Sequence, residues 1–483
     1  MKAAAALQLL RSYESRNITF MEADGSWPIV WERARGVHVW DADGGKYLDL
    51  TAAFGVAAAG HANPRVVRAG QRQMAKLLHA MGDVHPHALK AKLARELSAL
   101  TFERWFKVQG SRFKIQSSPS RAPRATHHGK TIFCNSGFEA VEAALKTAVL
   151  ATGRRGVIAF EGAYHGLGYG ALNATHREHF RAPFRSQLGE FGHFASFPTS
   201  AAQGDSQSAI ANSQGPVSDS QLPTGHQLSA IGYRRCTTEH VEVQLRRIFR
   251  REKIGAILVE PIQARGGIHI PPPDFLPMLR GVCDEHGALL ILDEIYTGFG
   301  RTGAWFACEH SGVVPDVICL GKALTGGFPL SACVGRADMM DAAWPLSTGE
   351  AIHTSTFLGH PVGCAMALAN LAEIRRLKLV ERTARLGEWL AEELFRVQSS
   401  KFKVGCRSVG VGLMAGVELV RADGSPATAE SLGIIKRLLH RGFIFLPEGE
   451  HANVIGFTPP LTISQRDLRR AVAALADELA SLP

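Results

Sequence analysis

Short apolar runs recur through the middle of the chain, and segments with helical periodicity separate most of them. Each run holds almost no polar position, so the strand it predicts must be buried on both faces. The segments between the runs, such as residues 138–152 and 275–287, repeat apolar residues at helical spacing. Alternation of this kind is typical of a mostly parallel sheet covered by helices, an α/β fold. The predicted strands are 131–134, 156–160, 254–260, 288–293 and 316–321.

The patterning also divides the chain into parts of unequal size. Residues 36–50 alternate around an Asp-Gly-Gly turn and predict a hairpin, while 363–398 predict a long helical region and 409–419 a strand. We expect an N-terminal segment, residues 1–65, that packs with a small C-terminal domain of residues 351–483.

Between these parts, residues 66–350 are expected to form the large domain. Two stretches within it, 107–130 and 196–232, are rich in small polar residues and lack any periodicity. Such segments have too little apolar surface to fold alone, so both are predicted to be insertions.

Composition narrows the class of protein. The 483 residues are 46% hydrophobic and 20% charged, which is ordinary for a globular chain. Lys and Arg (54) exceed Asp and Glu (44), and the net charge of +10 would suit an anionic ligand. The basic residues are dispersed, however, so a solvated basic surface and no nucleic-acid partner are expected.

The cysteines and the hydropathy pattern indicate location. Eight cysteines show neither a Cys-x-x-Cys pair nor a metal-type spacing with histidine, so buried thiols and no metal site are expected. No run approaches the roughly 18 apolar residues of a membrane span. The first fifteen residues predict a helix rather than a signal peptide. We therefore expect a cytoplasmic protein without a membrane segment.

Candidate chemistry lies where the predicted strands end. Glu260, Asp293 and Lys322 each follow an apolar run, and ligands of open α/β sheets bind outside the carboxyl ends of the strands. Ser136 and Gly137 begin a predicted helix, where free backbone N–H groups favour a phosphate.

These features together indicate a cofactor with a phosphate, a basic ring nitrogen and an aldehyde, which is pyridoxal 5′-phosphate (PLP). Lys322 would form the Schiff base, since a lysine in a dry site has a lowered pKa. Asp293 would pair with the ring nitrogen, and Tyr164 would stack on the ring. Taken alone, Lys322 could be a surface lysine, Asp293 a turn former and Tyr164 a packed side chain. The occurrence of all of them in this order and spacing favours the cofactor site.

At this point the sequence resembles the class III aminotransferases, the group that includes the ornithine and 4-aminobutyrate aminotransferases. The resemblance spans about residues 36–420. The motifs that carry it are "FCNSGFEAVEAALK", "YHG", "VEPIQARGG", "LLILDEIYTGFGRTG", "LGKALTGGFPLSA", "HTSTFLGHPVGCAMALA" and "GVGLMAGVEL".

The resemblance implies a PLP fold type I enzyme, similar to aspartate aminotransferase, that forms a homodimer with shared active sites. It also implies that Lys322 is the Schiff-base residue and that a threonine from the partner subunit, here Thr356, binds the phosphate. The cofactor-binding set expected on these motifs is Ser136, Gly137, Phe138, Tyr164, His165, Glu260, Gln263, Asp293, Ile295, Tyr296, Lys322 and Thr356.

Two departures from the family pattern concern the cofactor. Phe138 stands where the family usually has a small residue, so a bulky ring must fit beside the phosphate. Tyr296 stands where the family usually has a glutamine near the ring hydroxyl, and its phenol could make that hydrogen bond.

Other departures concern the substrate. Arg265 replaces a family glutamate, Val409 replaces an arginine that is displaced to Arg407, and Phe54 stands where some relatives have a tyrosine. Two hypotheses remain open for Arg265. It binds a substrate carboxylate from the opposite wall, or it points to solvent or to another anion and the pocket accepts an amine or carbonyl compound with little carboxylate recognition.

The expected activity is transamination between an amine or amino acid donor and a carbonyl acceptor, with altered carboxylate recognition. The nearest alternative is a PLP-dependent racemase, epimerase or aminomutase, which needs no second substrate. A non-catalytic protein on the same fold is a more distant alternative, and retention of both Lys322 and Asp293 counts against it.

Overall fold

The computed structural model describes residues 1–108, 127–199, 236–400 and 402–482. Its centre is a seven-stranded sheet in the order β4-β10-β9-β8-β7-β5-β6. All strands run parallel except β10, which is antiparallel to both of its neighbours. The predicted α/β class with a mostly parallel sheet is thus confirmed. The strands are β4 (Gly129–Cys134), β5 (Gly156–Phe160), β6 (Gly192–Ala195), β7 (Ile254–Val259), β8 (Leu289–Asp293), β9 (Val317–Leu320) and β10 (Ser331–Arg336).

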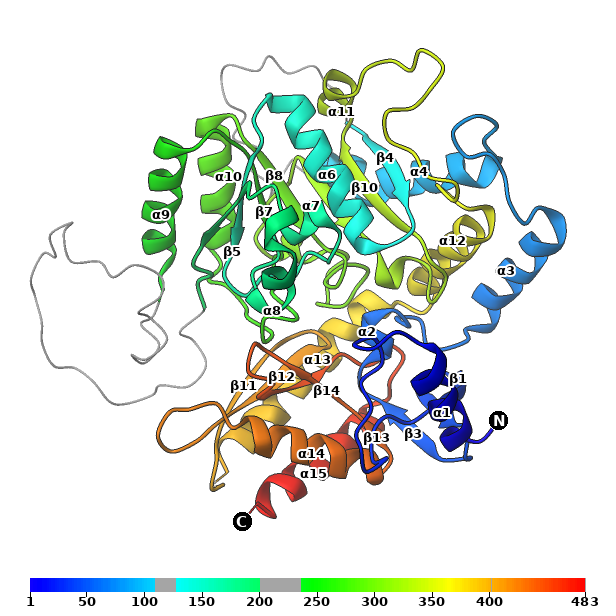
Figure 1. Ribbon diagram of the computed structural model, residues 1–483, viewed down its shortest axis with the longest axis vertical. Coiled ribbons are helices and arrows are strands. Elements are labelled where there is room, and N and C mark those ends of the chain that lie inside the picture. The colour runs from blue at the N-terminus through cyan, green and yellow to red at the C-terminus, as the bar shows by residue number, and fades with distance from the viewer. Residues whose placement is uncertain (109–126, 200–235, 401, 483) are drawn as a thin grey trace, which may run out of the picture.

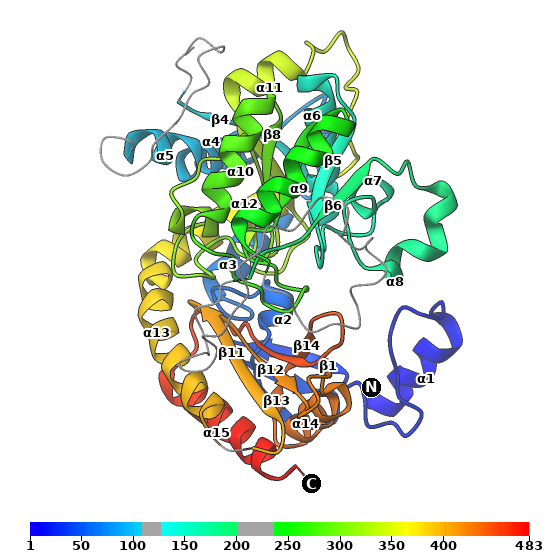
Figure 2. The same ribbon diagram turned by 90° about the vertical axis from the view of Figure 1, so that its left-hand side faces the viewer.

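Helices cover both faces of this sheet, which explains why its strands are apolar throughout (Figures 1 and 2). In β5, Val157 and Ala159 pack with α6, α7 and α11, whereas Ile158 and Phe160 pack on the opposite side with α4, α9, α10 and α12. Neither face is left to water. The helices of this region are α3 (Pro64–Lys76), α4 (Ala88–Leu100), α5 (Phe102–Val108), α6 (Gly137–Thr152), α7 (Tyr169–Leu172), α8 (Glu178–Arg181), α9 (Thr238–Arg251), α10 (Phe275–His286), α11 (Ala337–Ala343) and α12 (Pro361–Arg376).

A second, antiparallel sheet with the order β11-β12-β15-β14 forms the core of a lower lobe in Figure 1. Helices α13, α14 and α15 lie in the same lobe, and apolar residues of all three belong to the main core. The elements are α13 (Leu379–Gln398), β11 (Gly405–Val411), β12 (Met414–Val420), α14 (Thr428–His440), β14 (Leu446–Glu448), β15 (Val454–Phe457) and α15 (Gln465–Ala480).

The N-terminal strands join this lobe through a third sheet, β1-β2-β3-β13. Strand β13 pairs in parallel with β3, with Phe443 opposite Leu48 and Ile444 opposite Asp49. The predicted hairpin of residues 36–50 is present as β2 and β3. The elements are α1 (Ala3–Tyr13), β1 (Trp31–Arg35), β2 (His38–Asp41), β3 (Lys46–Asp49), α2 (Ala52–Gly55) and β13 (Phe443–Ile444).

Three local predictions need correction or restriction. The stretch 409–419 is a hairpin of β11 and β12 rather than one strand, because Gly412 turns the chain with a φ of +58°. The helical region 363–398 is two helices, α12 and α13, separated at Lys378 in a left-handed conformation. The predicted insertions lie mostly outside the described residues, and the described ends of the first one belong to α5 and β4.

In the described ranges, no helix has the length and apolar character needed to cross a membrane. The same residues include no group of three or more His, Cys, Asp or Glu side chains placed to hold a metal ion.

Candidate active site

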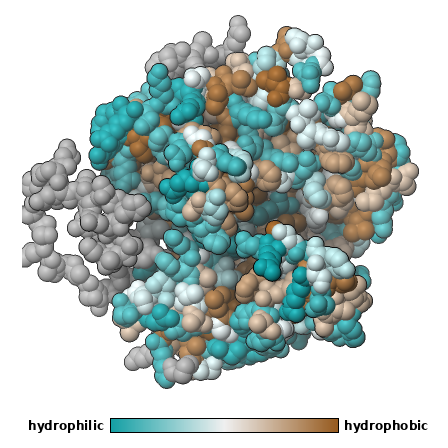
Figure 3. All heavy atoms as spheres, viewed as in Figure 1, coloured by the Kyte–Doolittle hydropathy of each residue, from teal (hydrophilic) through white to brown (hydrophobic). Residues whose placement is uncertain are grey.

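The sheet brings the three predicted strand-end residues together. Register pairs Val259 of β7 with Leu292 of β8, and Asp293 with Cys319 of β9. Glu260, Asp293 and Lys322 therefore leave neighbouring parallel strands at the same edge, where an open α/β sheet binds its ligands. On the face shown in Figure 3, the surface is hollowed between the upper and lower parts of the molecule.

Asp293 is buried and is held by two hydrogen bonds. His165 Nδ1 lies 2.8 Å from Asp293 Oδ2, and the backbone N–H of Ile295 donates to Oδ1 at 3.1 Å. The backbone N–H of His165 in turn donates to Thr175 Oγ1 at 3.0 Å. The imidazole and the backbone fix the orientation of the carboxylate, so it can serve a cationic ring nitrogen.

Lys322 is only partly accessible and begins a short 3-10 turn, η4 (Lys322–Leu324), with a φ of +38°. Burial lowers the pKa of its amine to about 8, although the carboxylates of Asp293, Glu260 and Glu448 oppose that shift. The amine nitrogen lies 3.9 Å from the centre of the Tyr296 ring. At neutral pH, a larger fraction of the Lys322 amine is therefore uncharged and nucleophilic than of the amine of a solvent-exposed lysine.

Glu260 holds two loops at the sheet edge. Its carboxylate accepts hydrogen bonds from the backbone N–H groups of Tyr164 (3.0 Å) and Ala264 (3.2 Å). Burial raises the pKa of Glu260 to about 7. Because both oxygens face backbone donors, Glu260 positions Tyr164 and the loop that leads to Arg265.

The predicted phosphate turn begins helix α6. Glu139 accepts from the backbone N–H groups of Asn135 (2.6 Å) and Ser136 (3.2 Å), which fixes the first turn. Ser331 Oγ donates to the carbonyl of Ser136 at 2.6 Å and ties this turn to β10. Gly137 packs closely on Ile295, since a Cβ at Gly137 would lie 3.0 Å from Ile295 Cδ1.

Phe138 fits because two glycines lie against it. A Cβ on Gly166 would be 2.3 Å from Phe138 Cβ, and a Cβ on Gly168 would be 2.5 Å from Phe138 Cδ2. The aromatic side chain packs on the backbone of the loop after Tyr164 and stays partly exposed. The bulky residue in the phosphate turn is thus matched by small residues in the facing loop.

Tyr164 and Ile295 occupy the expected neighbourhood on separate loops. Tyr164 contacts Phe180 edge-to-face at 5.6 Å between ring centres, and burial raises the pKa of its phenol. Ile295 lies against both Gly137 and Gly321, next to Lys322 in sequence. Ile295 thus lies between the predicted phosphate turn and the turn that carries Lys322.

The phenol of Tyr296 is directed to Thr458, with 3.2 Å between the two hydroxyl oxygens. Burial raises the pKa of this phenol, and Gly55 approaches the ring so closely that a Cβ there would lie 3.0 Å from it. The ring of Tyr296 faces Lys322, and its hydroxyl anchors the C-terminal lobe.

Other predicted residues are placed less centrally. Phe54 is half exposed on α2, in a run of left-handed residues from Ala52 to Gly55, and α2 contacts η4. Thr356 is exposed. Val409 packs with the apolar cluster that contains Tyr296.

Gln263 donates through its amide nitrogen to the carbonyl of Glu161, which directly follows β5, at 2.7 Å. Arg407 lies on the surface of β11, 3.9 Å from Glu418 of the next strand, and its side chain is 64% exposed.

Arg265 pairs with Glu448 of β14, with 3.0 Å between Nη1 and Oε2. Neither Glu448 nor Arg177, whose guanidinium donates to the carbonyl of Arg265, stood out in the sequence. The adjacent acids in "PEGE" were a weak signal for Glu448, and nothing in "THREH" distinguished Arg177.

The residues present fit PLP. Among the buried polar atoms that have no hydrogen-bond partner within the described part of the chain, three belong to predicted cofactor-binding residues: Ser136 Oγ, His165 Nε2 and Gln263 Oε1. Buried polar groups are nearly always satisfied, so such atoms mark a place for a ligand or water. Ser136 lies at a helix N-terminus suited to a phosphate, and Lys322 and Asp293 provide an amine and a carboxylate.

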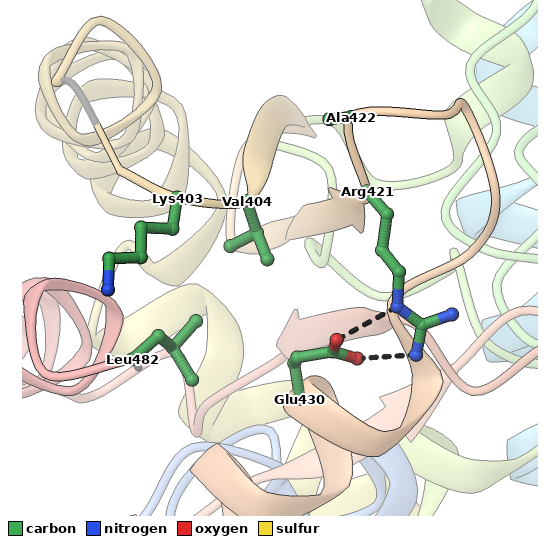
Figure 4. Close-up of a pocket in the computed structure, with 6 residues that line it drawn as sticks. All are labelled: Lys403, Val404, Arg421, Ala422, Glu430 and Leu482. Carbon is green, nitrogen blue, oxygen red and sulfur yellow. Dashed lines mark hydrogen bonds and ion pairs between the residues drawn. The ribbon is translucent and has the colours of Figure 1, made fainter.

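A separate shallow pocket in the C-terminal lobe lacks this chemistry (Figure 4). Its charged pair, Arg421 and Glu430, is joined by two hydrogen bonds of 2.8 Å and is satisfied internally. The pocket is lined by Lys403, Val404, Arg421, Ala422, Glu430 and Leu482.

Comparison with known proteins identifies the class. The family described as aminotransferase class-III matches residues 20–479, so the chain belongs to the class III aminotransferases. The resemblance inferred from the motifs is confirmed, and the protein is a PLP-dependent aminotransferase.

Individual relatives carry several aminotransferase names. The chain is 35% identical to the 5-aminovalerate aminotransferase of Pseudomonas aeruginosa, over 94% of each chain. It is 33% identical to the putrescine aminotransferase of Pectobacterium atrosepticum, over 95% of this chain and 84% of that one. Among solved structures, an amine transaminase from an uncultivated Pseudomonas species in the PLP-bound form has a TM-score of 0.77 at 26% identity, covering 97% of this chain and 98% of that one.

Proposed function

We propose that Lys322 is the catalytic residue of a transaminase in which Asp293 holds the ring nitrogen of PLP and Ser136, Gly137 and Phe138 hold its phosphate. The observation that carries this proposal is the low-pKa amine of Lys322 beside the Asp293–His165 pair, at the shared edge of β8 and β9. Tyr164 and Ile295 would face the two sides of the ring.

When bound, PLP supplies an aldehyde carbon that takes up an amino group and a ring that accepts electrons. The Lys322 amine would take the proton from the substrate carbon that bears the nitrogen, acting there as a general base, and would act as a general acid when that proton is given back. His165 fixes Asp293 so that a positive charge on the ring nitrogen stays paired. Partial burial of Lys322 keeps water from competing for the proton.

The donor class is proposed from the relatives. The names 5-aminovalerate, putrescine and 4-aminobutyrate aminotransferase describe proteins that act on primary amines at the end of a short chain. We propose a donor of this kind and a carbonyl acceptor. These relatives and the amine transaminase structure carry aminotransferase names, which favours two-substrate transfer over racemisation or aminomutation.

The assembly is proposed to be a homodimer. Large apolar side chains are exposed on two neighbouring segments, where the His79 and Phe357 rings lie 5.3 Å apart and Thr354 donates to Asp83 at 2.7 Å. Thr356 is exposed beside them and is proposed to reach the partner's phosphate site. The exposed apolar residues of this patch are Met74, Leu77, Leu78, Met81, Val84, Ile352 and Phe357.

The remaining proposals concern organisation and location. We propose a large domain of residues 66–350 and a small domain within residues 351–483, with residues 1–65 packed on the latter. Helix α12, predicted in the small domain, packs instead against α3 and α4 of the large one. The pairing of β13 with β3 supports that grouping. A cytoplasmic location is proposed on the eight free cysteines, six of them buried.

Absorption spectroscopy tests the role of Lys322. Wild-type protein with added PLP is expected to show a band at about 410–430 nm from the cofactor bound through the lysine, which borohydride abolishes. Lys322→Ala should lack the band, and the exposed-site variant Lys92→Ala should keep it. A wild-type protein without the band would refute the proposal.

A further inference from the structure

An ion pair connects the two lobes at the edge of the active site. Arg265 Nη1 lies 3.0 Å from Glu448 Oε2, and the side chains are 30% and 4% exposed respectively. The backbone of Arg265 is fixed on the same side, because its carbonyl accepts from Gly449 N at 3.2 Å and from the Arg177 guanidinium. The guanidinium of Arg265 is therefore aimed at Glu448 by its own loop.

The pair lies close to the reacting groups. The charges of both Arg265 and Glu448 act on the amine of Lys322, and the charges of Arg265 and Arg177 both act on the phenol of Tyr164. The charges of two guanidinium groups therefore act on residues proposed to hold the cofactor, and Glu448 is the carboxylate paired with one of them.

Such a pair is a poor way to stabilise a fold. A carboxylate that is almost wholly removed from water is costly to desolvate, and the attraction to its partner roughly offsets that cost. Burial accordingly raises the pKa of Glu448. A partly exposed arginine on one lobe, paired with a buried carboxylate on the other, is better suited to exchanging that carboxylate for another one than to stabilising the fold.

We propose that Glu448 is a specificity-determining residue whose carboxylate occupies Arg265 until a carboxylate of the substrate displaces it. This inference rests on the proposed function, because it assigns the substrate class of the same site. A donor without a carboxylate at this position leaves the pair intact. An acceptor that carries one binds Arg265 bidentately. The displaced Glu448 remains near Arg177, whose charge acts on it.

The consequence is a measurable competition. In wild-type protein a substrate carboxylate must replace an internal one, so its affinity is lowered. Removing the charge of Glu448 while keeping its shape frees Arg265 and should tighten carboxylate binding. Removing the guanidinium should abolish that binding whether or not Glu448 is present.

Calorimetric titration of the PLP-loaded enzyme with pentanoate tests this. Pentanoate has a carboxylate but neither an amine nor a carbonyl group, so it binds without reacting. We expect Glu448→Gln to bind it at least tenfold more tightly than wild type, and Arg265→Gln to lose binding in both backgrounds. Pentan-1-ol, which lacks the charge, should show no difference between the proteins.

The pair formed by Arg407 and Glu418 gives a matched control, because it joins the same residue types on the exposed surface of one lobe. Glu418→Gln and Arg407→Gln should leave pentanoate binding unchanged. Glu448→Asp, which keeps the charge but shortens the reach, should lie between wild type and Glu448→Gln and guards against misfolding of the latter.

An unchanged pentanoate affinity in folded Glu448→Gln would overturn the proposal, as would undiminished binding in Arg265→Gln. These outcomes are separable from failure of the proposed function. Heat of carboxylate binding does not depend on turnover, whereas failure of the Lys322 assignment would appear as a missing absorption band in wild-type protein.

Discussion

Replacing Lys322 with methionine should make the cofactor-free protein more stable at neutral pH. Methionine has a similar length and no charge, so it fills the same space without needing water. Burial lowers the pKa of the Lys322 amine from 10.5 to about 8. Each pKa unit corresponds to about 1.36 kcal/mol, so the buried ammonium destabilises the fold by up to about 3 kcal/mol at pH 7.

The sign follows from proton binding. The unfolded chain holds the proton of this amine up to pH 10.5, whereas the folded chain releases it near pH 8. Between these values the unfolded state binds more protons, so wild-type stability rises with pH through this window. The advantage of Lys322→Met is therefore largest below pH 8 and disappears near pH 10.5.

Urea denaturation measures the difference in free energy of unfolding between the two proteins. Both are unfolded without cofactor, at equal protein concentration, and at pH 7, 8, 9 and 10. Lys92→Met is the control. Lys92 is exposed on α4, so its replacement should change stability by less than about 0.5 kcal/mol. A Lys322→Met protein that is less stable than wild type at every pH, or a difference independent of pH, would refute the reasoning.

Two further predictions concern the cofactor cradle. Gly168→Ala should lower the stability of the fold by about 1–3 kcal/mol through overpacking, because its Cβ would lie 2.5 Å from the Phe138 ring. In thermal unfolding, the double variant with Phe138→Ala should recover most of this lost stability. Strictly additive losses of stability would contradict the prediction. His165→Ala should weaken PLP binding about 10- to 100-fold in a fluorescence titration, because Asp293 loses a hydrogen bond to a charged group. His165→Asn should restore part of that affinity, and a lack of any restoration would argue for a different role of the imidazole.

Local periodicity was enough to predict five of the seven strands of the central sheet, whereas β6 and the antiparallel β10 were not predicted. These strands are apolar on both faces, so each one can be recognised from its own residues without knowing which strands lie beside it. Glu260, Asp293 and Lys322 could be grouped because parallel strands end at one edge of a sheet. The hairpin of β11 and β12 was missed because Gly412 and Leu413 continue the apolar run, so the turn leaves no polar interruption.

The parts that could not be predicted depend on contacts between distant segments. The partner of Arg265 lies 183 residues further along the chain, and no local pattern specifies such a pairing. The space for Phe138 is provided by Gly166 and Gly168, whose small size has meaning only once the two loops face each other. Tyr296 was expected near the cofactor hydroxyl, but its own hydroxyl is directed to Thr458 on the other lobe.

The pairing of β3 with β13 has a consequence for synthesis of the chain. Leu48 and Asp49 leave the ribosome early, but Phe443 and Ile444, their partners, follow almost 400 residues later. At about 5–20 residues per second, the free edge of β3 waits roughly 20–80 s. An unpaired strand edge is a template for association with other chains. A nascent or truncated chain that lacks the last fifty residues therefore needs protection of its N-terminal strands until the C-terminal lobe arrives.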